Sequence, residues 1–122
     1  MNSPKTILVV DDHPDHLYFF QRVLGDAGYR VIEATNGDDA VAQARELLPN
    51  AIILDLVLPP TSGWDAARVL KQDTRTSSIP ILLVTAFPHQ ANDPWSGDAD
   101  CDALLVKPVD PKRLLAELER WT

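Results

Sequence analysis

The sequence predicts an α/β fold in which a doubly wound parallel sheet carries helices on both faces. Four short apolar runs are rich in Ile, Leu and Val and show no polar alternation, which is typical of strands buried on both faces. Longer amphipathic stretches lie between these runs, and the connections are short. A β/α alternation repeated about five times favours this architecture over a helical bundle or a β-sandwich.

The expected strands are the four buried runs and one weaker run. The buried runs cover residues 7–10, 51–54, 81–84 and 103–106. The weaker run, residues 29–34, alternates between polar and apolar side chains, and we expect it to form an edge strand.

Helical spacing of apolar residues predicts four regular helices, and proline, glycine and capping residues mark most of their limits. The first helix starts at Pro14 and can close at Gly25 or Gly28, and the second follows the turn Asn36-Gly37 and stops at Pro49. The third covers residues 64–71, and the last has Asp110 as its cap and Pro111 at its first position. A further helix is expected to be short and irregular, or replaced by a loop, because residues 88–100 contain Pro94 and Gly97. Inside a helix, proline costs roughly 3 kcal/mol and glycine about 1 kcal/mol.

Composition favours one soluble cytoplasmic domain over residues 1–122, with a core of about 5–121. The apolar runs are too short to span a membrane, and the N-terminus lacks the apolar stretch of a signal peptide. The single cysteine, Cys101, excludes an internal disulfide. A net charge of −7 disfavours direct nucleic-acid binding and leaves protein partners and metal cations open.

Each of the four buried runs is followed by side chains that can handle phosphate or a metal ion. Asp11 and Asp12 follow the first run, Asp55 the second, Thr85 the third and Lys107 the fourth. The carboxyl ends of parallel strands form one edge of a sheet, where ligands bind. We therefore expect three carboxylates, a hydroxyl and an ammonium to converge on one crevice.

These residues resemble the receiver domain of two-component response regulators, and the resemblance covers nearly the whole chain. The matching residues, in chain order, are the acidic pair Asp11-Asp12, the phospho-acceptor Asp55 with Pro59 and Gly63 in the loop after it, the switch residue Thr85 with Ala86, and Lys107 with the cis proline Pro108. The resemblance implies the flavodoxin-like strand order 2-1-3-4-5.

The resemblance also implies a bound Mg²⁺. Clustered carboxylates repel one another unless a cation intervenes, and Mg²⁺ takes carboxylates, waters and a phosphate oxygen. By resemblance, Asp12 and Asp55 bind the ion directly, together with the backbone carbonyl of Val57. Asp11 acts mainly through a bound water.

The implied chemistry is phosphoryl transfer onto Asp55. A carboxylate that attacks phosphorus gives an acyl phosphate, and such a transfer depends on positioning and on neutralising the phosphoryl oxygens. By resemblance, Mg²⁺ would neutralise one phosphoryl oxygen and Lys107 a second. The hydroxyl of Thr85 and the backbone N–H of Ala86 take the third.

The implied partners are a histidine kinase or phosphotransfer domain as donor and a downstream protein as target, and a homodimer is left open. We do not expect the chain to be an enzyme. It is expected to catalyse only its own phosphorylation and dephosphorylation. Its output surface departs from the family, because Leu104 stands where the family has an aromatic switch residue. This departure and the irregular segment 88–100 support an alternative, a scaffold that works without phosphorylation.

Other functions fit the residues less well. A flavin-binding protein needs a Ser/Thr-rich phosphate loop, whereas the chain has acidic residues after its first strand. A hydrolase with an aspartyl nucleophile typically has a second Asp at the position of Val57. The three histidines, His13, His16 and His89, show no ligand spacing with cysteines, and we expect solvated surface residues rather than a zinc site.

The residues at the two positions that tune phosphate lifetime in the family predict slow self-dephosphorylation. These residues are Val57 and Phe87, and neither can orient an attacking water, whereas both can exclude one. After phosphorylation with a small phosphodonor, we expect the wild type to lose its phosphoryl group more slowly than Phe87→Glu. Equal rates of loss would contradict the prediction.

Overall fold

The computed structural model describes residues 4–56, 63–85 and 102–122. It contains one parallel sheet in the order β2-β1-β3-β4-β5, which confirms the predicted fold class and strand order. The strands are β1 (Thr6–Val10), β2 (Arg30–Ala34), β3 (Ala51–Asp55), β4 (Ile81–Thr85) and β5 (Ala103–Val106). The weaker run therefore forms an edge strand, β2, as expected.

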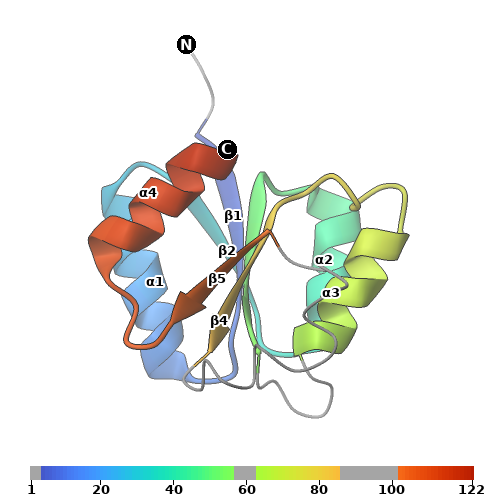
Figure 1. Ribbon diagram of the computed structural model, residues 1–122, viewed down its shortest axis with the longest axis horizontal. Coiled ribbons are helices and arrows are strands. Elements are labelled where there is room, and N and C mark those ends of the chain that lie inside the picture. Colours follow the sequence, from blue (N-terminus) through green and yellow to red (C-terminus); the bar gives the residue numbers. More distant parts are fainter. Residues whose placement is uncertain (1–3, 57–62, 86–101) are drawn as a thin grey trace.

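Four helices lie within the described residues, and they cover both faces of the sheet. They are α1 (Pro14–Asp26), α2 (Gly37–Leu47), α3 (Gly63–Gln72) and α4 (Pro111–Trp121). Figure 1 shows α1 and α4 on one face of the sheet and α2 and α3 on the other. The expected short helix at residues 88–100 lies outside the described residues. Within the described ranges, no helix is long and apolar enough to cross a membrane.

The core consists of two apolar layers, one on each face of the sheet. Leu8 and Val10 of β1 pack in the layer under α2 and α3, whereas Ile7 and Val9 pack in the layer under α1 and α4. All four side chains are buried, which explains why this run shows no polar alternation.

Capping residues start two of the helices: Asp110 caps α4 as predicted, and Asn36, predicted as part of a turn, caps α2. The Asn36 side chain accepts a hydrogen bond from the backbone N–H of Asp39 at 2.8 Å, and the Asp110 carboxylate accepts one from the N–H of Lys112 at 3.0 Å. At the start of α1, His13 is the N-cap residue and Pro14 is the first helical residue. Helix α1 therefore begins almost directly after β1 ends.

An ion pair joins α2 to the turn after α3. The Arg45 guanidinium donates to the Asp73 carboxylate at 2.6 Å, and the backbone N–H of Arg75 donates to the same carboxylate at 2.9 Å. The Arg75 backbone hydrogen bond and then the Arg45 guanidinium lower the pKa of the Asp73 carboxyl from 3.8 to about 2. This pair lies away from the strand ends and helps to hold α2 beside α3.

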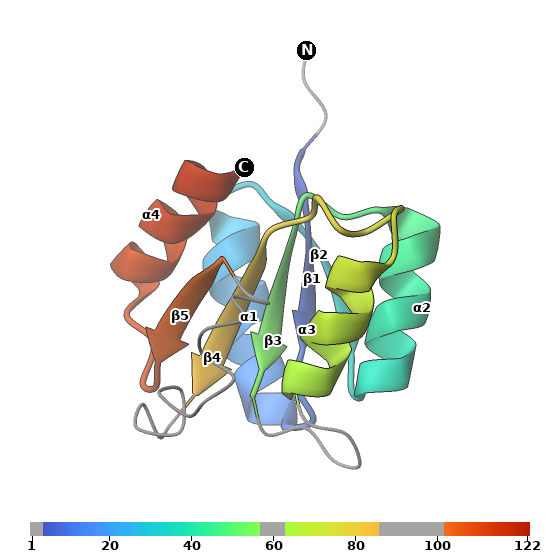
Figure 2. The same cartoon turned by 45° about the vertical axis from the view of Figure 1, so that its right-hand side comes forward.

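The register of the sheet brings the carboxyl ends of the strands to one edge. Asp55 pairs with Val84, and Thr85 pairs with Val106. The backbone N–H of Lys107 donates to the Thr85 carbonyl at 2.8 Å, which extends the β4–β5 ladder by one residue. In Figure 2 the arrowheads of β3, β4 and β5 point to the same end of the molecule.

Gly63, the first residue of α3, lies against the backbone of Asp55. A Cβ atom at this position would lie 2.2 Å from the Asp55 carbonyl oxygen and 2.8 Å from the Cα of Leu56. The Gly63 N–H also donates to the Leu56 carbonyl at 2.8 Å. Glycine is therefore required where α3 approaches the end of β3.

We predict that Gly63→Ala destabilises the fold by at least about 1 kcal/mol, because the added methyl group overlaps backbone atoms that cannot move aside cheaply. Gly25→Ala is the matched control. Nothing lies within 4 Å of a Cβ at Gly25, and alanine in a helix gains up to about 1 kcal/mol over glycine. Urea unfolding measures both free energies. Equal stability changes in the two variants would contradict the close approach.

Candidate functional site

Four predicted residues from four strand ends meet at one edge of the sheet. Asp11 directly follows β1, Asp55 ends β3, Thr85 ends β4 and Lys107 directly follows β5. Asp11 is 2 % exposed, Asp55 5 % and Thr85 1 %, so these polar side chains are buried as deeply as the core. The strands β1 and β3 are neighbours in the sheet although β2 lies between them in sequence, and this is the switch point where ligands bind in such folds.

A single ammonium lies between the two buried carboxylates. Lys107 Nζ donates to Asp55 Oδ2 at 3.1 Å and lies 3.9 Å from Asp11 Oδ2. Two carboxylates therefore share one positive side chain. Burial of unbalanced charge is costly, so the arrangement favours a further cation.

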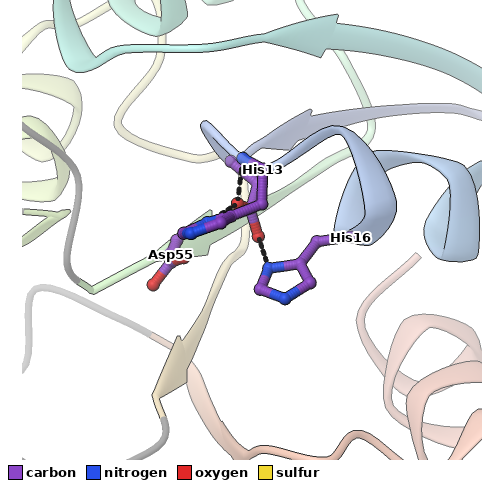
Figure 3. Close-up of side chains that lie close together, drawn as sticks. His13, His16 and Asp55 are labelled. Atoms are coloured by element: carbon purple, nitrogen blue, oxygen red, sulfur yellow. Dashed lines mark hydrogen bonds and ion pairs between the residues drawn. The ribbon is translucent and has the colours of Figure 1, made fainter.

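Two histidines hold the Asp11 carboxylate. The backbone N–H of His13 donates to Asp11 Oδ1 at 2.9 Å, and the Nδ1 atom of the same residue lies 3.3 Å from that oxygen. His16 Nδ1 lies 3.0 Å from Asp11 Oδ2. Figure 3 shows both imidazoles beside Asp55 at the strand ends.

The expectation for these two histidines was incomplete. Their side chains are exposed to solvent, 61 % for His13 and 39 % for His16, but both contact a buried carboxylate. Their shared partner is Asp11, an aspartate two and five residues earlier in the sequence, rather than a cysteine. A signal was present: Asp11, His13 and His16 span the end of a strand and the first turn of a helix.

One ligand atom each from Asp11, His13, His16 and Asp55 lies within 4.8 Å of the other three. Asp12 is not part of this group. Its side chain is 35 % exposed, and its Oδ1 lies 3.0 Å from His13 Nδ1. The direct metal contact expected of Asp12 stays a prediction.

Of the other predicted site residues, the structure describes Pro108 and Leu104. The Lys107–Pro108 peptide bond is cis. Leu104 pairs with Leu83 of β4 and packs, partly buried, against the core layer under α2 and α3. Val57, Ala86 and Phe87 lie outside the described residues.

The donor set fits a magnesium ion. Mg²⁺ binds through one or two carboxylates and keeps several waters. The pair Asp11 and Asp55 offers carboxylate oxygens at a sheet edge, and the ammonium of Lys107 lies within 4 Å of both side chains.

Comparison with known proteins agrees with this geometry. Residues 7–119 match the family model described as response regulator receiver domain. Protein PilH of Pseudomonas aeruginosa is 38 % identical over 109 residues, which are 89 % of this chain and 90 % of PilH. The chemotaxis response regulator CheY4 of Vibrio cholerae has a similar structure, with a TM-score of 0.87, 29 % identity and coverage of 98 % and 99 % of the two chains.

A third similar protein was solved with a metal. The receiver domain of the sensor histidine kinase PA1611 from Pseudomonas aeruginosa has a magnesium ion coordinated in its active-site cleft. It matches with a TM-score of 0.86 and 29 % identity over 97 % of each chain. The family match, the strand order and the strand-end residues lead to one conclusion: the chain belongs to the response regulator receiver domains, the phospho-accepting modules of two-component signalling.

Proposed function

We propose that Asp55 is the phospho-acceptor of this receiver domain, that Mg²⁺ assists the transfer, and that the phosphorylated form changes its binding to a protein target. The observation that carries the proposal is the position of Asp55. Its carboxylate is buried at the end of β3, accepts a hydrogen bond from Lys107 and lies beside Asp11.

In the proposed transfer, an oxygen of Asp55 attacks the phosphorus atom of the donor. A P–O bond forms to Asp55, and the bond from phosphorus to the donor's leaving atom breaks, with its electron pair going to the donor. The ammonium of Lys107 is already 3.1 Å from Asp55 Oδ2 and moves with the new charge to a phosphoryl oxygen. In this proposal the chain catalyses only its own phosphorylation and its own dephosphorylation.

Asp11, Asp12, Asp55 and the backbone carbonyl of Val57 would hold the metal ion. When bound, Mg²⁺ supplies positive charge that neutralises the phosphoryl oxygens during transfer. Asp11 is suited to orient this site because the two histidines contact its two different oxygens.

Thr85 is the proposed switch residue, whose hydroxyl would bind the phosphoryl group after transfer. It ends β4, the strand next to β3, and its backbone carbonyl accepts a hydrogen bond from the N–H of Lys107. A movement of Thr85 toward the phosphoryl group therefore acts on the two strand ends that carry Thr85 and Lys107. Leu104, in β5, is the side chain through which such a movement would pass in place of an aromatic residue.

The proposed donor is a phosphorylated histidine of a kinase or phosphotransfer domain. A groove of about 450 Å³ opens beside the pocket and offers an apolar surface for such a domain. It is lined by His16, Phe19, Phe20, Lys107, Pro108 and Val109. Burying the carboxylates of Asp11 and Asp55 beside the Lys107 ammonium costs stability. A scaffold that works without phosphorylation would gain nothing from these buried charges.

Incubation with acetyl phosphate and Mg²⁺ tests the acceptor. We expect intact-mass measurement to find one added phosphoryl group on the wild type and none on Asp55→Asn, because an amide cannot act as the nucleophile. Chelation of Mg²⁺ should abolish the labelling as well. Asp15→Asn is the control, since Asp15 is an exposed aspartate in the first turn of α1 and should leave labelling intact. Labelling that persists in Asp55→Asn would contradict the proposal.

A further inference from the structure

We propose that His13 and His16 make this pocket a mixed nitrogen and oxygen site that binds Zn²⁺ in preference to Mg²⁺. The inference rests on the proposed role of Asp11 and Asp55 as metal-facing carboxylates and adds two ligands to it. The observation behind it is the group of four donor atoms that lie within 4.8 Å of one another, two from aspartates and two from histidines.

The separations suit a zinc ion. Zinc takes four ligands in a tetrahedron at roughly 2.0–2.2 Å, which places neighbouring donor atoms about 3.3–3.6 Å apart. His13 Nδ1 lies 3.3 Å from Asp11 Oδ1, and His16 Nδ1 lies 3.0 Å from Asp11 Oδ2. These two distances run to different oxygens of Asp11, and one donor atom from each of the four residues lies within 4.8 Å of the others, so the side chains must move closer together to hold one ion.

The histidines are also positioned well with respect to each other. Their ring centroids lie 4.6 Å apart, with the ring planes inclined by 37°. His13 is the N-cap residue of α1 and His16 lies in its first turn, so both come from the start of a helix that follows directly after β1. Their solvent exposure leaves a path by which an ion can enter.

The charge of the pocket matches a divalent cation. Asp11 and Asp55 contribute two negative charges, and Lys107 contributes one positive charge. Lys107 Nζ lies 3.4 Å from His16 Nδ1 and 3.1 Å from Asp55 Oδ2, so it must swing away when the ion enters. Its partly exposed position and flexible stem allow this movement.

The ligand types decide between the two metals. Imidazole nitrogens suit zinc and other transition metals, whereas Mg²⁺ prefers an all-oxygen shell and keeps its waters. An acidic pocket without histidines offers both ions the same oxygens. In this chain, His13 and His16 add ligands that benefit zinc far more than magnesium.

Calorimetric titration of the full chain, with a competing chelator for the zinc arm, measures both affinities. We expect one Zn²⁺ to bind at least about 100-fold more tightly than Mg²⁺. In H13N/H16Q we expect the zinc affinity to fall at least about tenfold and the magnesium affinity to change by less than the zinc affinity. The single variants H13N and H16Q should each lose part of the zinc affinity. H89Q is the control, because His89 is the one other histidine in the chain, and it should bind zinc like the wild type.

Nuclear magnetic resonance gives a second readout that is independent of affinity. One equivalent of Zn²⁺ should shift the imidazole nitrogen resonances of His13 and His16 and leave those of His89 in place. Native-like amide spectra of the variants would show that they are folded. Unchanged zinc affinity in H13N/H16Q, or a loss of the same size in H89Q, would overturn the proposal.

The two proposals about this pocket can fail separately. A protein that binds zinc through His13 and His16 but never acquires a phosphoryl group on Asp55 would refute the proposed function and keep the zinc site. A protein that is labelled on Asp55 but binds zinc equally well without the two histidines would do the reverse.

Discussion

The two buried carboxylates of Asp11 and Asp55, which share the single ammonium of Lys107, are the constraint on which the rest of this structure depends. β1 and β3 are neighbours in the sheet, so both strands deliver an acidic residue to the same point. Lys107 brings one ammonium to two carboxylates that are almost fully buried, and burying such charges is costly. The pocket therefore attracts added positive charge, and this is the condition that phosphoryl transfer onto a carboxylate requires. The buried negative charge that costs stability also favours binding of the cation that the proposed phosphoryl transfer needs.

The fold supports this pocket from several directions. The apolar layers on the two faces of the sheet hold β1, β3 and β4 in a register that ends them together. Gly63 lets α3 start directly against the backbone of Asp55. The early start of α1, at Pro14, brings His13 and His16 onto the Asp11 carboxylate. The sheet thus positions Asp55, the proposed acceptor, and the starts of two helices position its neighbours.

Much of this arrangement could be predicted from the sequence, for physical reasons that differ between its parts. Unbroken apolar runs such as residues 7–10 identify buried strands, and the residues after them identify the pocket, because parallel strands end at one edge. Periodicity does not determine which strands are neighbours, so the order came from the family resemblance. The contacts of His13 and His16 with Asp11 lie within five residues along the chain, whereas their approach to Asp55 depends on β1 and β3 becoming neighbours in the sheet. The resemblance marked Gly63, and the structure adds the reason, a backbone contact with Asp55.

The most direct test of the account is the effect of Mg²⁺ on thermal unfolding. If a divalent cation balances the buried carboxylates, Mg²⁺ should stabilise the wild type, by about 2.7 kcal/mol at a concentration one hundred times its dissociation constant. Asp11→Asn and Asp55→Asn should lose most of this stabilisation, whereas Asp15→Asn should keep it. A wild-type midpoint that does not respond to Mg²⁺, or a response that survives in both pocket variants, would contradict the account.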